Sequence, residues 1–395
     1  MGIFSEHRTQ SIFSRLFTIL VGFFLSINLL HAQLYQTIET KIIDPHFFSR
    51  IGTSEWASGG VRTVEPGSPT AVFDNPALLY SDSYSIYTEF GKRSETSYNA
   101  PGINVDGEYL LPNTITAAGT IDCIHVGLGY ARIYERYIHF TAPITTETQP
   151  DGTGEYASYR STYRVHAVAG SAVYSVDSTI SIGLSAGVTL ATVDDELLST
   201  RYSGNGFGLL VIAGMYARPV KIFHAGISVK YYSKISSSGT TTNNVVVFTS
   251  PPSPDNRYPF SATFPFTVSA GCKFDATDDI SLMGEFDLVK WYNVDPATYN
   301  NTVNEHLGIR CRPVENVFVR VGYFTQLDPR IPYYAGSYDQ QFWTAGTDWD
   351  ITPHMTVRFS TVQCFFSKTR IFGSYFRSSQ ILDQDLLLTG IQYNF

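Results

Sequence analysis

Residues 380–395, QILDQDLLLTGIQYNF, are the segment that decides the fold class of this chain. Its last five residues place Ile391, Tyr393 and Phe395 at every second position, with polar residues between them. A period of two is typical of a β-strand whose two faces meet different surroundings. A soluble β-sandwich would show the same alternation, so the pattern predicts a strand and leaves the class of sheet open.

The carboxy-terminal aromatic residue narrows the class of sheet. A last strand that alternates in this way and ends on phenylalanine is similar to the signal that the bacterial barrel-assembly machinery reads. We therefore expect Tyr393 and Phe395 to form an assembly signal, and that machinery to be a partner of the chain. The same observation favours a membrane β-barrel over a soluble sandwich.

Upstream of this segment, the chain repeats the same period of two. In residues 180–190, for example, Ile, Leu, Ala or Val alternates with Ser, Gly or Thr. The pattern predicts fourteen strands, which cover residues 83–92, 112–121, 123–134, 160–175, 179–193, 205–218, 223–235, 260–275, 279–292, 303–313, 316–326, 340–350, 353–366 and 380–395.

The connections between these strands alternate in length. Even-numbered strands pass to odd-numbered ones through short turns, whereas the longer links 93–111, 135–159, 236–259 and 327–339 follow odd-numbered strands. Short turns on one rim and long loops on the other are typical of outer-membrane barrels, whose short turns face the periplasm. We therefore predict a 14-stranded antiparallel β-barrel over residues 83–395, in the outer membrane of a Gram-negative bacterium and in contact with its lipid.

Composition agrees with a barrel and excludes other classes. Among 395 residues, only 16% are charged and 14% are aromatic, while an ordinary globular protein has about 25% charged residues. The mean hydropathy is −0.04, and outside the first 32 residues the chain has no apolar run of about 18 residues, which excludes a polytopic helical membrane protein. A net charge of −8 argues against a nucleic-acid partner.

Residues 1–32 are typical of an export signal. Arg8 and Arg15 form a basic region, the segment 16–30 is mostly apolar, and Ala32 precedes the expected cleavage site before Gln33. The alternative is a retained membrane helix, which the short apolar run disfavours.

Export would allow disulfides, but the four cysteines lie far apart, and we interpret them as wall residues rather than as one or two bridges. The alternation places Cys272 and Cys311 on the lipid face, and Cys123 and Cys364 on the lumen face.

The segment between the signal and the first strand, residues 33–82, contains the motif that resembles a known family. Residues 52–80 read GTSEWASGGVRTVEPGSPTAVFDNPALLY. This stretch resembles the amino-terminal plug of the FadL/TodX family of outer-membrane transporters for long-chain fatty acids and hydrocarbons, a superfamily that includes the PorV/PorQ branch. Gly59-Gly60 and Asn75-Pro76-Ala77 occupy the matching places, and Leu78 stands where the family usually has glycine.

The resemblance implies a barrel with a plug and a transport function for hydrophobic small molecules such as long-chain fatty acids. The PorV/PorQ branch implies an alternative, an outer-membrane component of a secretion system that binds or shuttles protein cargo. A structural outer-membrane protein is a third possibility. The resemblance also makes Gly59, Gly60, Asn75, Pro76 and Ala77 candidates for a movable gate, although a fixed corner capped by Asn75 before Pro76 would need the same residues.

The presumed lumen face carries a charged cluster on the predicted strands 279–292, 303–313 and 316–326. We predict an ion-pair network that ties the plug to the wall, with Arg310 or Arg320 as the partner of Glu285. An alternative is that one arginine binds the carboxylate of a fatty acid. The expected members of this network are Glu285, Asp287, His306, Arg310, Arg312 and Arg320.

The sequence predicts no enzyme, cofactor or metal site. The nine histidines lack the paired spacing of metal ligands, and neither a nucleophile with a base nor a phosphate-binding loop stands out.

The resemblance also implies that ligands leave sideways through the third strand, where Gly127 and Gly129 would permit a bend. Small residues that make room for a plug are the alternative explanation for these two glycines.

Overall fold

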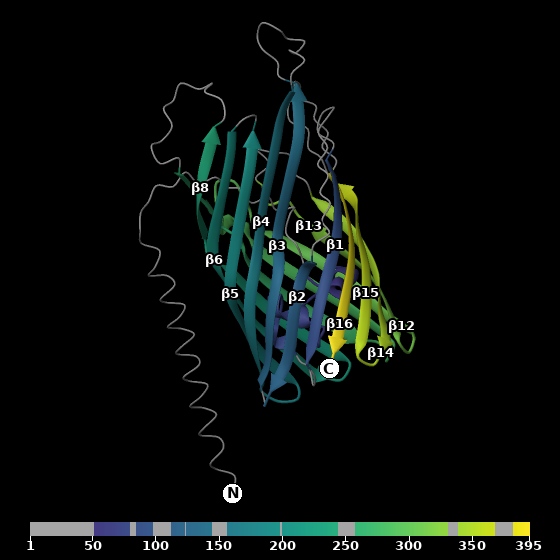
Figure 1. The fold of residues 1–395 in the computed structure, drawn as a ribbon. Helices are drawn as coiled ribbons and strands as arrows, with labels where there is room; N and C mark the ends of the chain where they lie inside the picture. The colour runs from purple at the N-terminus through teal and green to yellow at the C-terminus, as the bar shows by residue number, and fades with distance from the viewer. Residues whose placement is uncertain are drawn as a thin grey trace, which may run out of the picture. The chain divides into compact units, whose positions relative to one another are not determined.

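The computed structural model describes residues 51–79, 84–97, 112–122, 124–143, 156–197, 200–243, 257–330, 339–367 and 382–395. Its strands form one antiparallel sheet that closes on itself, because the first strand, β1, pairs with the last, β16 (Figure 1). The signal peptide expected over residues 1–32 and Cys123 lie outside the described residues.

The strands are β1 (Ser85–Ser97), β2 (Pro112–Ile121), β3 (Ile124–Pro143), β4 (Tyr156–Ser175), β5 (Ile180–Leu197), β6 (Thr200–Val220), β7 (Phe223–Tyr232), β8 (Ile235–Asn243), β9 (Arg257–Ala262), β10 (Phe266–Asp275), β11 (Ile280–Lys290), β12 (Thr302–Val314), β13 (Val317–Gln326), β14 (Gln340–Thr352), β15 (Met355–Ser367) and β16 (Leu382–Asn394). In the described residues these sixteen segments make fourteen barrel strands. Both β7 and β8 pair with β6, so they are two parts of one strand. In the same way, β9 and β10 pair with β8 and β7 and form the next strand. The predicted 14-stranded barrel is confirmed.

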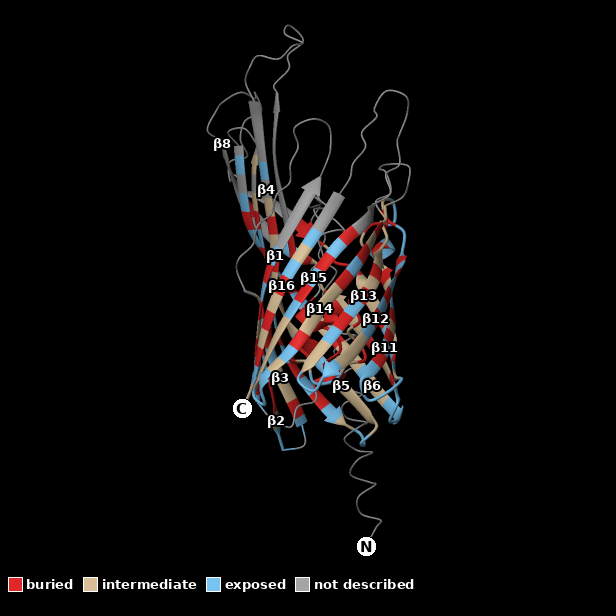
Figure 2. Cartoon of the chain, turned by 90° about the vertical axis from the view of Figure 1, so that its right-hand side faces the viewer, coloured by how far each residue is buried: buried red, intermediate tan, exposed pale blue. Residues whose placement is uncertain are grey.

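The two faces of the wall have the expected chemistry. On β13, Val319 and Val321 are exposed on the outer face, whereas Arg320 and Phe324 are buried inside. Figure 2 shows this alternation of buried and exposed residues along β13 to β16. Cys272 is exposed and Cys364 is buried, on the faces that the sequence predicted. The apolar outer face suits lipid, and the inner face holds most of the charge.

Six short turns lie between described strands and join β2 to β3, β4 to β5, β6 to β7, β10 to β11, β12 to β13 and β14 to β15. We call this edge of the barrel the short-turn end. These turns are the connections that the sequence predicted to be short. In outer-membrane barrels such turns face the periplasm, so the opposite end is the extracellular one.

Strands β3 to β6 are longer than the other uninterrupted strands, with 18 to 21 residues each. The predicted links 135–159 and 236–259 are therefore too long, because β3, β4 and β8 extend into them. In Figure 1, β3 and β4 extend well beyond β2 at the extracellular end. On the outer face of this extension, apolar residues such as Leu190 and Phe207 give way to charged pairs, including Arg201 and Asp194 with Nη2 and Oδ2 2.8 Å apart. The change from apolar to charged side chains marks the upper edge of the apolar band.

The plug fills the lumen with short helices. They are the α-helix α2 (Thr53–Ala57) and the 3₁₀ helices η2 (Pro69–Phe73) and η3 (Pro76–Leu78), and all their residues are buried. Helix α2 contacts β13 to β16, while η3 contacts β4 to β6 on the other side of the barrel. One further 3₁₀ helix, η4 (Trp291–Asn293), follows β11. No helix in the described part of the chain combines the length and the apolar character needed to cross a bilayer.

The closing strand gives a first test. The rings of Tyr393 and Phe395 lie 4.9 Å apart, and the Phe395 N–H donates to the Tyr84 carbonyl next to β1. If these residues form the assembly signal, Tyr393→Ala combined with Phe395→Ala lowers the amount of heat-modifiable, folded barrel in outer-membrane fractions. The matched control is Phe286→Ala with Phe359→Ala, which removes two lipid-facing rings outside the terminal strand. Equal losses in both variants would show that the terminal rings act only as lipid contacts.

Candidate functional site: the plug and the lumen pocket

The plug backbone lies directly against inward-facing glycines of the wall. A Cβ added to Gly226 on β7 would lie 1.8 Å from the Thr63 carbonyl oxygen, and one added to Gly308 on β12 would lie 2.5 Å from that of Ser58. Real Cβ atoms do not approach backbone atoms so closely, so any larger residue would displace the plug. The wall glycines that contact plug backbone in this way are Gly183, Gly226, Gly308 and Gly322.

The predicted plug glycines meet the same wall from the inside. Gly59 and Gly60 have φ angles of 71° and 77°, the left-handed region that favours glycine. A Cβ on Gly59 would also lie 2.2 Å from the Leu307 carbonyl oxygen. Both the turn and the close approach therefore require glycine at position 59.

Asn75, Pro76 and Ala77 form the corner that the motif indicated. Asn75 caps η3, since its side-chain oxygen accepts from the Ala77 N–H at 3.2 Å, and Pro76 is the first residue of the helix. The Asn75 side-chain amide also donates to the carbonyl oxygens of Thr63 at 2.9 Å and Met215 at 3.2 Å. One side chain thus ties two parts of the plug to β6, while movement of this corner as a gate stays a prediction.

The buried carboxylates of β11 contact the plug through Arg62. Its guanidinium Nε lies 3.4 Å from Glu285 Oε1, and its Nη2 lies 2.7 Å from Asp287 Oδ2. The backbone N–H groups of Arg62 and Thr63 donate to Glu285 Oε2 at 2.9 and 2.8 Å. Because Asp287, Asp74 and Glu285 surround it, the pKa of Arg62 is raised even though burial opposes the charge.

Arg310 and Arg320 bind a different plug carboxylate, Glu65. The Nη1 atoms of both arginines lie 2.6 Å from its oxygens. The expected pairing of either arginine with Glu285 is therefore wrong, because Arg62, which sequence reasoning did not identify, lies beside that carboxylate. Burial alone would raise the pKa of Glu65, but the guanidinium groups of Arg320 and Arg310 hold it well below its usual range.

The other two members of the predicted network lie in different places. His306 is buried, with Nε2 3.3 Å from Asp287 Oδ2 and Nδ1 2.8 Å from the Gly59 carbonyl oxygen. Arg312 instead pairs with Asp279 at the short-turn end, where both side chains are partly exposed. Five of the six predicted residues therefore surround the plug, and Arg312 belongs to the rim.

Gly127 and Gly129 on β3 also face the plug. A Cβ on Gly127 would lie 2.6 Å from Leu79 Cδ2, and one on Gly129 would lie 2.6 Å from Phe73 Cε2. At these positions β3 pairs without interruption with β2 and β4, and its bulge lies further on, at Ile133. The structure thus places both glycines where they make room for the plug, and a lateral opening at β3 stays a prediction.

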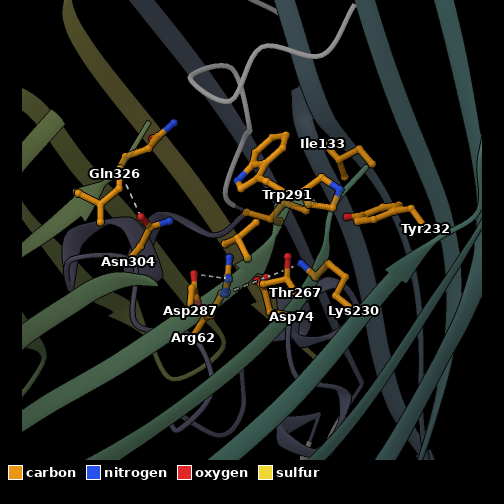
Figure 3. A pocket seen from close by; sticks show the side chains of 14 residues that line it. Arg62, Asp74, Ile133, Lys230, Tyr232, Thr267, Asp287, Trp291, Asn304 and Gln326 are labelled. Carbon is orange, nitrogen blue, oxygen red and sulfur yellow. Dashed lines mark hydrogen bonds and ion pairs between the residues drawn. The ribbon is translucent and has the colours of Figure 1, made fainter. Parts of the chain in front are cut away.

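A pocket of about 100 Å³ lies in the lumen on the extracellular side of the plug. We call it the lumen pocket. Figure 3 shows Ile133, Tyr232 and Trp291 together on one side of it, and charged residues on the other. Its lining residues are Ile51, Arg62, Asp74, Ile133, Lys230, Tyr232, Pro265, Thr267, Asp287, Val289, Trp291, Asn304, Gln326 and Leu327.

The floor and the walls of the lumen pocket differ in chemistry. On the floor, Asp74 Oδ1 lies 3.3 Å from Lys230 Nζ and 3.7 Å from Arg62 Nε, so the charges are matched. The walls continue into an aromatic cluster in which the Phe264 ring lies 5.1 Å from that of Tyr232 and 5.9 Å from that of Tyr134. An apolar molecule can therefore bind against the walls, while the floor favours polar groups.

Metal binding has no support among the described residues, where no three His, Cys, Asp or Glu side chains form a group that could hold an ion. Among the described cysteines, Cys272, Cys311 and Cys364 form no disulfide. Arg62, Glu65 and Trp291 are the important residues that sequence reasoning missed. For Arg62 a signal existed, since it is the basic residue that closely follows Gly59-Gly60 in the plug motif.

Comparison with solved structures identifies the fold. The toluene transporter TbuX of Ralstonia pickettii matches with a TM-score of 0.66 and 13% identity, over 87% of this chain and 98% of that one. The toluene transporter TodX of Pseudomonas putida gives 0.66 and 13%, over 89% and 99%. A FadL homologue of Pseudomonas aeruginosa gives 0.65 and 13%, over 88% and 99%. No protein-family model and no curated protein matches the sequence.

These likenesses show that the chain has the FadL/TodX-like fold that the plug motif suggested. A barrel of this fold, with an apolar outer face, belongs in the outer membrane of a Gram-negative bacterium.

The contact of Glu285 with Arg62 generates a prediction about stability. Glu285→Ala leaves a buried guanidinium with fewer partners and lowers the free energy of unfolding by about 3–5 kcal/mol. Arg62→Ala has a similar effect, and the double variant loses clearly less than the two effects added together. Urea unfolding followed by the heat-modifiable gel shift measures all three. As a control, Arg310→Ala should combine additively with Glu285→Ala; strong coupling there and none with Arg62 would contradict the assignment.

The glycine contacts generate a second prediction. Gly308→Ala forces a Cβ against the Ser58 backbone and lowers the free energy of unfolding by about 1–3 kcal/mol. The matched control is Gly284→Ala on the adjacent strand, where the nearest atom would be 3.7 Å from the new Cβ. That variant should unfold at the same or a slightly higher urea concentration. If both variants behave alike, close approach to the plug is not what requires glycine at position 308.

Proposed function

We propose that the protein is an outer-membrane channel for small hydrophobic molecules and that the lumen pocket is its binding site. The observation that carries this proposal is a pocket with apolar walls, on Ile133, Val289 and Trp291, that ends on a charged plug. The solved barrels of the same fold include toluene transporters and a monoaromatic hydrocarbon channel, which supports this class of ligand.

The charged floor bears on the route that a ligand takes. To cross the plug directly, an apolar molecule would have to separate Arg62 from Asp287 and Lys230 from Asp74, which are buried pairs. Breaking a buried pair costs about 3–5 kcal/mol, and an apolar ligand offers no replacement. We therefore propose that the ligand leaves the pocket through the wall; Gly127 and Gly129 face plug residues and do not line the pocket, so the predicted opening there stays a separate prediction.

The size of the pocket favours compact ligands. Its volume is about 100 Å³, and an apolar protein cavity of about 150 Å³ accepts benzene. A single aromatic ring is thus a better match than an extended acyl chain. Transport of long-chain fatty acids, which the resemblance implied, stays a prediction. For a carboxylate ligand, the guanidinium groups of Arg310 and Arg320 already have Glu65 as a partner.

The alternative function, shuttling of secreted protein cargo, rests on the resemblance of the plug segment to a superfamily that includes the PorV/PorQ branch. Most side chains of the predicted links 135–159 and 236–259 lie outside the residues whose side chains are described. No observation in the described part of the chain favours cargo binding over small-molecule transport, so it stays a prediction.

The pocket wall provides the test of the proposed function. Val289→Thr keeps the shape of the side chain but adds a hydroxyl that an aromatic hydrocarbon cannot satisfy, at a cost of about 1–3 kcal/mol. Toluene binding to the purified barrel should weaken by about tenfold, since 1.4 kcal/mol is a factor of ten. Uptake of labelled toluene into proteoliposomes should slow as well.

The control is Val193→Thr, because Val193 is equally inward and buried but does not line the pocket. If Val289→Thr and Val193→Thr bind toluene alike, the lumen pocket is not the site. If the unaltered protein neither binds nor takes up toluene, the same binding and uptake measurements are repeated with naphthalene and with a medium-chain alkane. Failure with all three compounds would overturn the proposal that the ligand is a small hydrophobic molecule.

A further inference from the structure

The lumen pocket is lined by a buried tyrosine whose hydroxyl the protein does not pair. Tyr232 is only 9% exposed, and Figure 3 shows its hydroxyl turned toward the middle of the pocket. In the described part of the chain this hydroxyl has no hydrogen-bond partner. A buried hydroxyl without a partner is costly, and most such groups in proteins are paired. The position of the Tyr232 hydroxyl therefore indicates a ligand that can form a hydrogen bond with it.

Two further polar side chains lie beside this tyrosine. Lys230 and Thr267 stand opposite each other at the end of the ladder between β7 and β10, and both line the pocket. An ammonium group has three N–H groups to donate, and that of Lys230 donates to Asp74 Oδ1 at 3.3 Å. The side-chain hydroxyl of Thr267 has no partner among the described residues. We call Lys230, Tyr232 and Thr267 the polar edge, which can both donate and accept a hydrogen bond.

The charges on the floor of the pocket disfavour a charged ligand. Arg62 lies beside Asp74 and Asp287, and Lys230 lies beside Asp74. A ligand carboxylate would meet the two aspartates, and a ligand ammonium group would meet the arginine and the lysine, so either charge would be buried next to a like charge. An uncharged hydroxyl avoids both costs. It also matches the polar edge, because a hydroxyl donates one hydrogen bond and accepts others.

The rest of the pocket suits an aromatic ring. Ile133, Val289 and Trp291 supply apolar surface, and apolar walls with a few placed polar groups are typical of small-molecule sites. The volume of about 100 Å³ leaves room for one compact ring. A ring that carries one hydroxyl can therefore lie against the apolar wall while its oxygen reaches the polar edge.

We propose that the lumen pocket selects single-ring aromatic molecules with one uncharged hydroxyl, such as phenol, and that the polar edge determines this specificity. The ligand hydroxyl accepts from Lys230 Nζ and donates to the oxygen of Tyr232 or Thr267. A phenolic hydroxyl loses its proton only at about pH 10, so this ligand is uncharged at neutral pH. The inference rests on the proposed function, since it names the ligand class of the same pocket.

Phenol and toluene test this specificity, because they are similar in size and differ by a hydroxyl in place of a methyl group. Nanodiscs that carry the barrel are dialysed to equilibrium against each labelled compound. Empty nanodiscs of the same lipid measure partition into the bilayer, which serves as the apolar reference. The ratio of phenol affinity to toluene affinity should be about tenfold higher, or more, for the pocket than for the lipid, since a site built to pair a hydroxyl rejects an analogue that lacks it.

Tyr232→Phe removes the unpaired hydroxyl and keeps the ring that packs against Phe264. The ratio of phenol affinity to toluene affinity should fall by about tenfold. Because the hydroxyl has no partner among the described residues, urea unfolding should not change. Thr267→Val keeps the shape of its side chain and should lower the same ratio from the opposite strand. The matched control is Tyr163→Phe, which removes a hydroxyl from a buried tyrosine that does not line the pocket and should leave the ratio unchanged.

The outcomes separate this specificity from the proposed function. If both compounds bind but the pocket has the same ratio as the lipid, or if Tyr232→Phe and Tyr163→Phe change the ratio alike, the specificity is overturned and the proposed function stands. Benzoate binding as tight as phenol binding would contradict the uncharged class. If phenol binds through Tyr232 and toluene does not bind, the specificity stands and transport of hydrocarbons fails. Binding of neither compound would overturn the specificity together with the pocket as a site for aromatic ligands.

Discussion

The plug fits inside the barrel because its backbone rests on wall positions that have no side chain. At Gly226 on β7 and Gly308 on β12, a methyl group would overlap a plug carbonyl. Dense packing of this kind leaves the plug one position rather than a range of positions. That single position brings Arg62 within hydrogen-bonding distance of Asp287, and Glu65 within reach of Arg320.

Charge matching follows from this placement. The inner wall carries acidic residues on β11 and basic residues on β12 and β13, and either group alone would be costly to bury. The plug places Arg62 beside the acidic residues and Glu65 beside the basic ones. As a result the floor of the lumen pocket is a layer of paired charges, in which Arg62 lies beside Asp287 and Lys230 beside Asp74.

The wall departs from regular pairing at the level of the lumen pocket. Ile133, which lines the pocket, is the bulged residue of β3, and Pro265, which also lines it, interrupts the strand made of β9 and β10. Bulges and breaks re-aim side chains, and here they supply part of the apolar wall of the pocket.

The sequence by itself determined the fourteen strands, their two faces and the short turns, because a period of two and the chemistry of turns are local properties of the chain. It did not determine the lengths of the long links, since β3, β4 and β8 extend into residues that it predicted to be links. The cap that Asn75 provides for η3 is local in the same sense. The tertiary structure alone decided that Arg62 rather than Arg310 lies beside Glu285, and that Gly127 faces the plug. Arg62 and Glu285 are 223 residues apart, and such a pair forms only after the barrel has closed around the plug, which no local pattern encodes.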